Sequence, residues 1–414
     1  MIKSYYSLGL MSGTSMDGVD ASIIHSDGTT KYQEISNKYF EYNKELYQDL
    51  TNIRDKITSS KDLKTLQNEL KSIEKEITLF HAQVVKEIVK ESSVEIDFIG
   101  FHGQTIFHNV DERISKQLGD GKLLSKLTKK IVVYDFRQND LKNWGNGAPL
   151  APIFHHVMVS QINDQFKIGY PIQVINIGGI SNITSTSDPK GPDIGFGIVY
   201  ANDIGPGNCL IDEWIRKKTK KRYDKDGLIA MSGKTNKSIL KKALENFSEE
   251  NLNKYLEAPK NNIRYKRSFD TKDFDISFVK NLSLEDGAAT LTDFTAAIIA
   301  QGINIASGMK NPNLTKWLVC GGGRKNKYLM DSVIKKGPEY LKTDDPVFNE
   351  KLDDLKTISL EPIEKYEIDG DFVESQAFAY LAIRSYLKLP ISFPSTTCCK
   401  EEYGCTGGII IKNF

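Results

Sequence analysis

The residues best suited to chemistry come early in the chain, in a glycine-rich turn between two apolar stretches. Residues 8–24 read LGLMSGTSMDGVDASII, and the apolar alternation on both sides predicts a strand, a tight turn and a second strand. Gly13 and Gly18 are expected to let the backbone enter conformations closed to other residues and to approach a ligand. The turn N–H groups and the Thr14 and Ser15 hydroxyls can hold phosphate oxygens. The pattern predicts a phosphate-binding hairpin.

Two carboxylates accompany this turn and extend the predicted site to a metal ion. Asp17 and Asp20 would repel a phosphate unless a hard cation lay between them, and Mg²⁺ is held in this way by few carboxylates, waters and substrate phosphates. The alternative is a polar hairpin without a ligand, since Asp-Gly is a common hairpin turn. A Walker loop is excluded, because Gly-Lys-Ser/Thr is absent and no helix follows directly. The predicted phosphate and metal residues are Gly13, Thr14, Ser15, Met16, Asp17, Gly18, Val19 and Asp20.

A second glycine turn and a candidate base occur further along the chain. The strand, turn and strand pattern recurs at residues 172–185, with Gly178 and Gly179 in the turn, which suggests two similar domains facing each other over one nucleotide. The sequence DIGPGN at 203–208 then leads into a predicted helix. Asp203 at this glycine-rich helix mouth is a candidate general base, and the alternative is a helix N-cap.

Polar side chains also lie at strand ends and strand breaks, where α/β proteins place ligands. The buried strand predicted at 98–108 is interrupted by His102 and Gln104. A histidine in such a strand can equally be a structural core residue, so both interpretations stay open. The strand predicted at 131–137 ends on Arg137, whose guanidinium is suited to a carboxylate.

Two further glycine-rich segments complete the candidate set. The loop at 143–150 is expected to enter a helix near Pro149, and a helix start of this kind can receive an anion or a sugar hydroxyl. Trp144 in this loop could stack on a sugar ring or cover the core. Residues 318–330 predict an apolar strand, three glycines and a helix, where bare backbone suits a flat base or ribose.

Composition and scaffold limit the possible classes of protein. At 414 residues the chain is expected to form two domains, residues 1–168 plus 371–414 and residues 169–370. It has 39% hydrophobic and 26% charged residues and no stretch long enough to cross a membrane. A signal peptide is not evident, so we expect a cytoplasmic protein. The net charge of +1 gives no field that would recruit nucleic acid or a membrane.

The five cysteines are scattered and show no paired CxxC spacing. Cys398, Cys399 and Cys405 could form a weak metal cluster, but reduced thiols without a role fit a cytosolic chain better. The small-residue helices predicted at 286–300 and 371–384 suit close helix crossings at a hinge.

Taken in order, these motifs resemble the actin-like ATPase superfamily, whose members are built as two facing ribonuclease-H-like α/β domains with a nucleotide and sugar cleft between them. Within it, the sequence resembles the anhydro-N-acetylmuramic acid kinases. The loop departs from the usual Gly-Gly-Gln-Gly at Trp144 and Asn146, and Cys398 replaces a common glycine. The segments that carry the resemblance are 9–20, 103–105, 135–137, 145–150, 176–179, 203–208, 321–323, Asn326, Glu374, 389–390 and 393–394.

The resemblance implies a specific reaction. Such kinases open the 1,6-anhydro bond of anhydro-N-acetylmuramic acid with water and transfer the γ-phosphoryl group of ATP to O6, giving N-acetylmuramic acid 6-phosphate and ADP, with ATP and Mg²⁺ as cofactors. Asp203 matches the family's catalytic aspartate, Asp17 and Asp20 are the expected metal residues, and a homodimer is implied. The other implied residues are Gly178, Gly179, Gly205, Gly321, Gly322, Gly323 and Asn326 for ATP, and His102, Gln104, Arg137, Asn146 and Glu374 for the sugar.

Two alternatives keep the same nucleotide chemistry. An ordinary hexose or amino-sugar kinase would use the base to deprotonate a free hydroxyl and would need no water. A non-catalytic actin-like ATPase would hydrolyse ATP without any sugar. The polar residues His102, Gln104 and Arg137 argue for a small polar substrate and against the second alternative.

Overall fold

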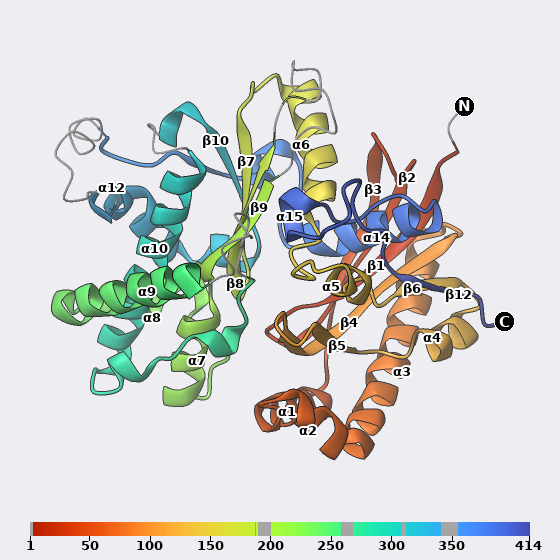
Figure 1. Cartoon of the computed structure of the whole chain (residues 1–414), viewed down its shortest axis with the longest axis horizontal. Helices are drawn as coiled ribbons and strands as arrows, with labels where there is room; N and C mark the ends of the chain where they lie inside the picture. Colours follow the sequence, from red (N-terminus) through yellow and green to blue (C-terminus); the bar gives the residue numbers. More distant parts are fainter. Residues whose placement is uncertain (1–2, 187, 189–199, 258–267, 308–311, 341–354) are drawn as a thin grey trace. The chain divides into compact units, whose positions relative to one another are not determined.

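The structure is a computed structural model, and it describes residues 3–186, 188, 200–257, 268–307, 312–340 and 355–414. The chain forms two compact units (Figure 1). One unit comprises Met1–Gln165 and Asp371–Phe414, and the other comprises Phe166–Gly370. Each unit contains one mixed β-sheet with helices packed on it, so the predicted α/β class is confirmed.

The first unit is built on a seven-stranded sheet. Its three first strands form an antiparallel meander, and parallel strands continue the sheet on the side of β1. The strand order is β12 (Ile409–Ile411), β6 (Ile131–Tyr134), β4 (Phe98–Asn109), β1 (Tyr5–Ser12), β2 (Gly18–Ser26) and β3 (Tyr32–Glu41), with β5 (Ile114–Leu118) paired to β4.

The second unit repeats this order in a five-stranded sheet. Its meander again forms one side of the sheet, and two parallel strands again continue it. The strand order is β11 (Leu360–Pro362), β10 (Lys316–Cys320), β7 (Ile172–Ile177), β8 (Ile180–Thr186) and β9 (Tyr200–Pro206). The recurrence of the hairpin pattern in the sequence therefore corresponds to a repeated sheet topology.

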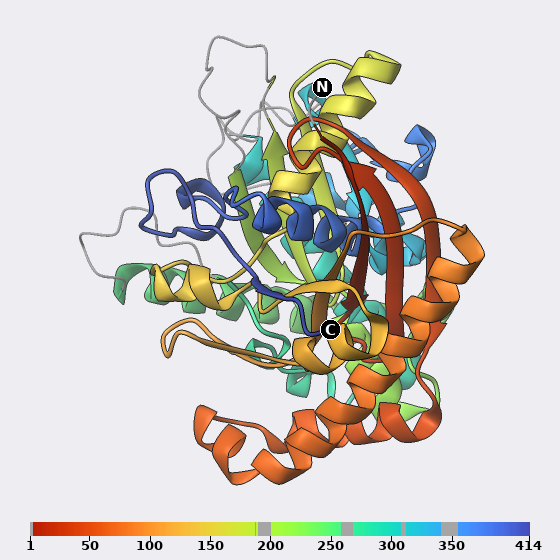
Figure 2. The same ribbon diagram turned by 90° about the vertical axis from the view of Figure 1, so that its right-hand side faces the viewer.

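Helices cover the sheets. On β1, alternate residues point to opposite faces: Leu8 and Leu10 pack with α3 (Gln67–Ser92), whereas Met11 packs with α14 (Val373–Tyr386). Figure 2 shows these two helices beside the strands of the first sheet. The other helices are α1 (Lys44–Lys56), α2 (Ser60–Thr65), α4 (Gly121–Thr128), α5 (Gln138–Lys142), α6 (Pro152–Phe166), α7 (Cys209–Lys218), α8 (Leu228–Ser232), α9 (Lys237–Glu257), α10 (Leu284–Ala306), α11 (Lys327–Asp331), α12 (Gly337–Tyr340) and α15 (Pro394–Thr397).

Three local predictions need correction. The strand predicted to end on Arg137 stops at Tyr134, because Asp135 adopts a φ of 55° and turns the chain. The strand predicted to break at His102 continues through it, with a register shift at this residue in its pairing with β1. The small residues of α14 were predicted to allow a close crossing of helices, but they pack onto the sheet, where Ser375 lies against β1. No described helix is both long enough and apolar enough to cross a membrane.

Gly9→Ala is expected to destabilise the first unit. A Cβ at Gly9 would overlap the Ser375 carbonyl and lie 2.5 Å from the Ala379 nitrogen, and this α14 backbone cannot move without disturbing its own helix. Overpacking of this kind costs about 2–3 kcal/mol, which urea unfolding would measure. Gly13→Ala is the matched control, because the nearest atom to its Cβ, the Ser15 hydroxyl, is 3.9 Å away. Equal stability of the two variants would contradict the packing argument.

Candidate active site

The β1–β2 turn has an unexpected backbone conformation. The special backbone conformation predicted for Gly13 and Gly18 is wrong, because the left-handed residue of the turn is Met16, with a φ of 58°. Met16 is 2% exposed, and its N–H donates to the Gly13 carbonyl at 3.2 Å. Gly18 is required for packing instead, since a Cβ there would lie 2.6 Å from the Tyr39 ring. Buried Met16 and Val19 anchor the turn and leave its polar residues outside.

The carboxylates and hydroxyls of the turn form one polar group. Thr14 and Ser15 are exposed, and Asp17 and Asp20 are half-buried. The Ser15 hydroxyl donates to Asp17 Oδ1 at 2.5 Å. Burial raises the pKa of Tyr42, and the nearby carboxylates of Asp17 and Asp20 raise it further. The donor set of two carboxylates beside two exposed hydroxyls fits what Mg²⁺ and phosphate require.

Gln104 holds the turn from the neighbouring strand. It is fully buried, and its Nε2 donates to the Gly13 carbonyl at 3.0 Å, while its Oε1 lies 2.6 Å from the Ser12 hydroxyl. The Tyr42 hydroxyl donates to the same Ser12 hydroxyl at 3.0 Å. Both ends of the Gln104 amide are thus used inside the protein, which favours a positioning role over the predicted sugar contact.

His102 and Arg137 form a second polar cluster in the same unit. Arg137 Nη2 lies 3.0 Å from His102 Nε2, and Arg137 Nη1 donates to the Gly147 carbonyl at 2.8 Å. His102 Nδ1 lies 2.8 Å from the Gly103 carbonyl. Because a guanidinium only donates, Nε2 is the acceptor and the proton is on Nδ1. Burial and the Arg137 charge hold the pKa of His102 well below its usual range, so this histidine is neutral.

Glu374 adds a carboxylate to this cluster. It lies in the first turn of α14, four residues before Phe378, whose ring is 4.5 Å from that of His102. Burial raises the pKa of Glu374, and the charge of Arg137 opposes this rise. A neutral imidazole, a guanidinium and a desolvated carboxyl group therefore belong to one polar cluster, and such clusters of perturbed groups are common at functional sites.

The loop that contains Asn146 is organised by Asp140, which no sequence pattern identified. The Asp140 carboxylate accepts from the Ser392 hydroxyl at 2.5 Å, the Thr397 hydroxyl at 2.6 Å and the Gly147 N–H at 2.7 Å. The Asn146 N–H donates to the Thr397 carbonyl at 2.7 Å. Because Ser392 and Thr397 come from the end of the chain, only the folded structure brings them next to Asp140.

Trp144 carries two cations on its ring. The Arg113 guanidinium lies 3.2 Å from the centre of its ring and the Lys400 ammonium lies 3.9 Å from it. The indole is 53% exposed, so in this structure it binds basic side chains at the surface and does not cover the core.

In the second unit, the glycines of the β7–β8 turn contact the start of α7. The Gly178 carbonyl accepts from the Asn208 N–H at 2.8 Å, and the Gly179 carbonyl accepts from the Gly207 N–H at 2.9 Å. Gly205 lies beside this contact with a φ of 149°. The structure thus brings the second predicted phosphate turn next to the DIGPGN segment.

Asp203 lies on β9, opposite Asn182. Its Oδ2 accepts from the Phe269 N–H at 3.0 Å and from the Ser268 hydroxyl at 3.1 Å, and the residue is half-buried. The alternative interpretation of Asp203 as a helix cap is wrong, because Asn208 occupies the N-cap position of α7. The carboxylate is therefore oriented by two donors through one of its oxygens.

The three glycines after β10 differ in role. A Cβ at Gly321 would overlap Asn176, and one at Gly323 would overlap Ile177, so both serve the packing of β10 on β7. Gly322 has no heavy atom within 4 Å of a Cβ position, which leaves it open to a ligand. Asn326 caps α11 through Oδ1, which accepts from the Leu329 N–H at 3.0 Å, and it is buried. A cap explains Asn326 without a nucleotide.

The comparisons with known proteins agree along the whole chain. A family model described as "Anhydro-N-acetylmuramic acid kinase" matches residues 5–411. A protein of that name from Pelagibacter ubique is 50% identical over 414 residues, which is 100% of both chains. One from Agrobacterium fabrum is 34% identical over 98% of both chains. A solved ROK family glucokinase from Streptomyces griseus, in complex with glucose and AMPPNP, covers 91% of this chain and 99% of its own. It is 12% identical and has a TM-score of 0.35, which is too distant for an inference.

Proposed function

We propose that this chain, which belongs to the anhydro-N-acetylmuramic acid kinase family, uses ATP to phosphorylate anhydro-N-acetylmuramic acid. Water opens the 1,6-anhydro ring, and the γ-phosphoryl group passes to the freed O6, giving N-acetylmuramic acid 6-phosphate and ADP. The observation that carries the proposal is the carboxylate of Asp203, the first residue of the DIGPGN segment, which the Ser268 hydroxyl and the Phe269 N–H hold in place. Neither the ordinary hexose kinase nor the non-catalytic ATPase has support from the comparisons.

Asp203 is proposed as the general base. O6 is masked as an ether and becomes a nucleophile only when the C1–O6 bond breaks, so ring opening and phosphoryl transfer must be coupled in one positioned site. Asp203 takes a proton from the water that attacks C1. The Phe269 N–H and the Ser268 hydroxyl fix one carboxylate oxygen and thereby orient the carboxylate.

The β1–β2 turn is proposed to bind the transferred phosphate. The Gly13, Thr14 and Ser15 segment would donate N–H and hydroxyl groups to phosphate oxygens. Asp17 and Asp20 would hold Mg²⁺, directly or through water, and the ion would supply charge neutralisation between the β- and γ-phosphates. In the second unit, Gly178, Gly179 and Gly205 are the proposed phosphate residues. The open backbone of Gly322 is proposed to contact the base or ribose, with Gly321, Gly323 and Asn326 supporting it.

The sugar is proposed to bind at the second polar cluster of the first unit. Arg137 and neutral His102 would bind the lactyl carboxylate and hydroxyls, with Asn146 and Glu374 beside them. Gln104 would act by holding the phosphate turn. The homodimer implied by the resemblance and the cytoplasmic location expected from the sequence both stay predictions.

Release of ADP tests the proposal. The protein is given ATP and Mg²⁺ with anhydro-N-acetylmuramic acid, N-acetylmuramic acid, N-acetylglucosamine or no sugar. We expect ADP and a 6-phosphate only with the anhydro sugar. Equal rates with the free sugars would establish the ordinary kinase, and equal rates without sugar would establish the ATPase.

Arg137→Lys is expected to raise the KM for the sugar about tenfold with a smaller change in kcat, because an ammonium cannot replace the planar, bidentate guanidinium. The Arg137 guanidinium donates hydrogen bonds to His102 Nε2 and to the Gly147 carbonyl at the same time. Steady-state kinetics with the sugar as the varied substrate measures this. Arg113→Lys is the matched control, because Arg113 stacks on Trp144 outside the cluster. An unchanged KM in Arg137→Lys would refute the assignment.

A further inference from the structure

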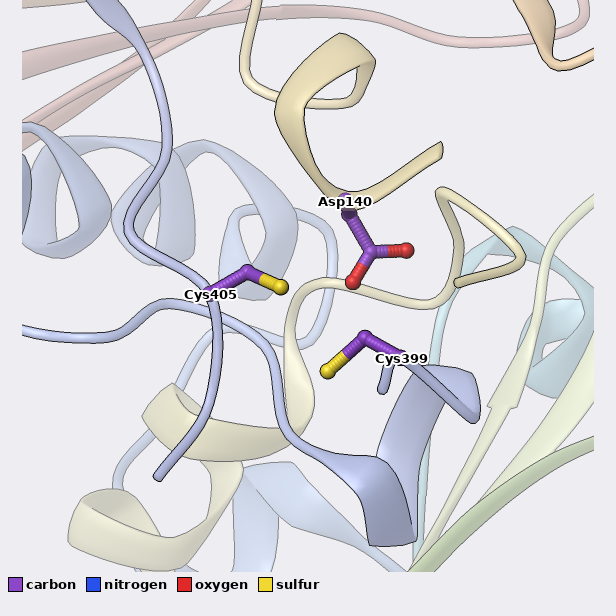
Figure 3. Close-up of side chains that lie close together, drawn as sticks. All are labelled: Asp140, Cys399 and Cys405. Carbon is purple, nitrogen blue, oxygen red and sulfur yellow. The ribbon is translucent and has the colours of Figure 1, made fainter. Parts of the chain in front are cut away.

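Two cysteines and an aspartate converge near the loop that carries Asn146 (Figure 3). Asp140, Cys399 and Cys405 are all buried, and their carboxylate and sulfur atoms lie within 4.8 Å of one another. Both cysteines are free thiols. Cys399 follows α15, and Cys405 pairs with Ser392 in an isolated antiparallel bridge. The mechanism proposed above uses none of the three.

The geometry favours sulfur chemistry over metal binding. The Asp140 carboxylate already accepts three hydrogen bonds, from Ser392, Thr397 and Gly147. A tetrahedral zinc site needs four ligands, and the described residues supply only these three at this place. A metal would therefore have to compete for a satisfied carboxylate and find a fourth ligand. The two sulfurs, by contrast, lie within 4.8 Å of each other and need no further group to form a bond.

The two thiols differ in chemical character. The neighbouring Cys405 thiol lowers the pKa of Cys399, while burial and the Asp140 carboxylate oppose this shift without reversing it. The same contact raises the pKa of Cys405. A thiol that ionises more easily beside a second thiol is the arrangement of a nucleophilic and a resolving cysteine.

We propose that Cys399 and Cys405 are a modification site that forms a reversible disulfide under a peroxide oxidant. The Cys399 thiolate attacks one oxygen of hydrogen peroxide, the O–O bond breaks, and water leaves after protonation. Cys405 then attacks the resulting sulfenic sulfur, releases its proton and expels the second water. Two thiols and one peroxide thus give one disulfide and two waters. A dithiol reductant reverses the oxidation.

The segment that joins the two cysteines is an exposed turn. Glu401, Glu402 and Tyr403 lie between the two cysteines, and all three are exposed. Gly404, with a φ of 88°, ends the turn before Cys405. Opening of this short segment admits a molecule as small as peroxide, so the reaction is expected to be slower than that of an exposed thiol.

The cysteine segment is connected to the sugar loop. The Lys400 N–H donates to the Asn143 carbonyl at 2.9 Å, and the Asn146 N–H donates to the Thr397 carbonyl at 2.7 Å. Lys400 also covers Trp144. A disulfide draws the sulfurs to about 2.05 Å, and this shift of Cys399 moves both contacts of the loop. On the proposed function, the disulfide raises the KM for the anhydro sugar about fivefold and leaves kcat within about twofold.

The experiment treats the full-length protein with hydrogen peroxide and measures intact mass and kinetics before and after reduction. We expect a loss of two hydrogen atoms per chain, and tryptic peptides joined across the cleavage site at Lys400. Cys399→Ser and Cys405→Ser abolish the link, and the matched control Cys398→Ser keeps it. If either serine variant misfolds, the linked peptide in wild type still decides whether the disulfide forms.

The outcomes separate the claims. Absence of the linked peptide overturns the disulfide. If wild type retains one equivalent of Zn²⁺ through dialysis and Cys405→Ser does not, the three residues form a metal site and the disulfide proposal is also overturned. A disulfide with an unchanged KM overturns its connection to the sugar loop. Absence of kinase activity in the reduced protein overturns the proposed function alone, since the mass measurement does not depend on it.

Discussion

Asp203→Asn is expected to lower kcat about a thousandfold, within the range that a general base contributes. The amide has nearly the shape of the carboxylate, and its oxygen can still accept from the Phe269 N–H and the Ser268 hydroxyl. The fold and the binding of ATP should therefore persist, while the proton of the attacking water has no acceptor. Single-turnover kinetics and nucleotide binding to the same protein sample measure the two effects separately.

Ser268→Ala is the matched control for this variant. It removes one of the two donors that orient Asp203 but leaves the base and the Phe269 N–H in place. A decrease of about ten- to a hundredfold, smaller than that of Asp203→Asn, is expected, since one hydrogen bond to a charged group contributes about 1.5–3 kcal/mol. If Asp203→Asn retained most of the wild-type rate, the role of Asp203 as base would be refuted.

The double variant Asp17→Asn, Asp20→Asn is expected to lower kcat/KM for ATP about a hundredfold at a fixed Mg²⁺ concentration. It is also expected to raise the Mg²⁺ concentration needed for the half-maximal rate. Mg²⁺ in proteins depends on one or two carboxylates, and these are the two that lie near Tyr42. A Mg²⁺ titration of the ADP-release rate gives both values, and the single variants show which carboxylate contributes more.

Asp120→Asn provides the control for the carboxylate pair. Asp120 caps α4 in the same unit by accepting from the Lys122 and Leu123 N–H groups, and asparagine is an equally good cap. Its Mg²⁺ requirement should equal that of wild type. A double Asp17 and Asp20 variant with a wild-type Mg²⁺ requirement would show that the metal, if used, binds elsewhere.

The architecture could be predicted from the sequence because it follows local periodicity. The alternation around the turn at 13–18 and again around Gly178 and Gly179 predicted two strand pairs, and both are present as β1–β2 and β7–β8. The repeat of the pattern suggested two similar domains, and the two units do share a sheet order. These features depend on neighbours a few residues apart, which a sequence displays directly.

The local geometry of the sites could not be predicted in the same way. The strained position of the first turn is Met16, because its buried side chain anchors the turn, whereas composition pointed to the glycines. Gln104 serves the turn because Ser12 and Gly13 lie beside it on the neighbouring strand. Asp140 meets Ser392 and Thr397 from 252 and 257 residues away. Such contacts are fixed by tertiary packing, and a single sequence carries no periodic signal for them.

Reaction of wild-type protein with ATP, Mg²⁺ and the anhydro sugar in ¹⁸O-labelled water tests the coupled mechanism most directly. If water attacks C1 and the bridging oxygen stays on C6, a single turnover analysed at once by mass spectrometry gives one ¹⁸O at C1 and none in the phosphate ester. Unlabelled product kept in the same water for the same time controls for exchange at the anomeric carbon. Label in the phosphate ester, or a C1 oxygen no more labelled than this control, would contradict ring opening coupled to phosphorylation of O6.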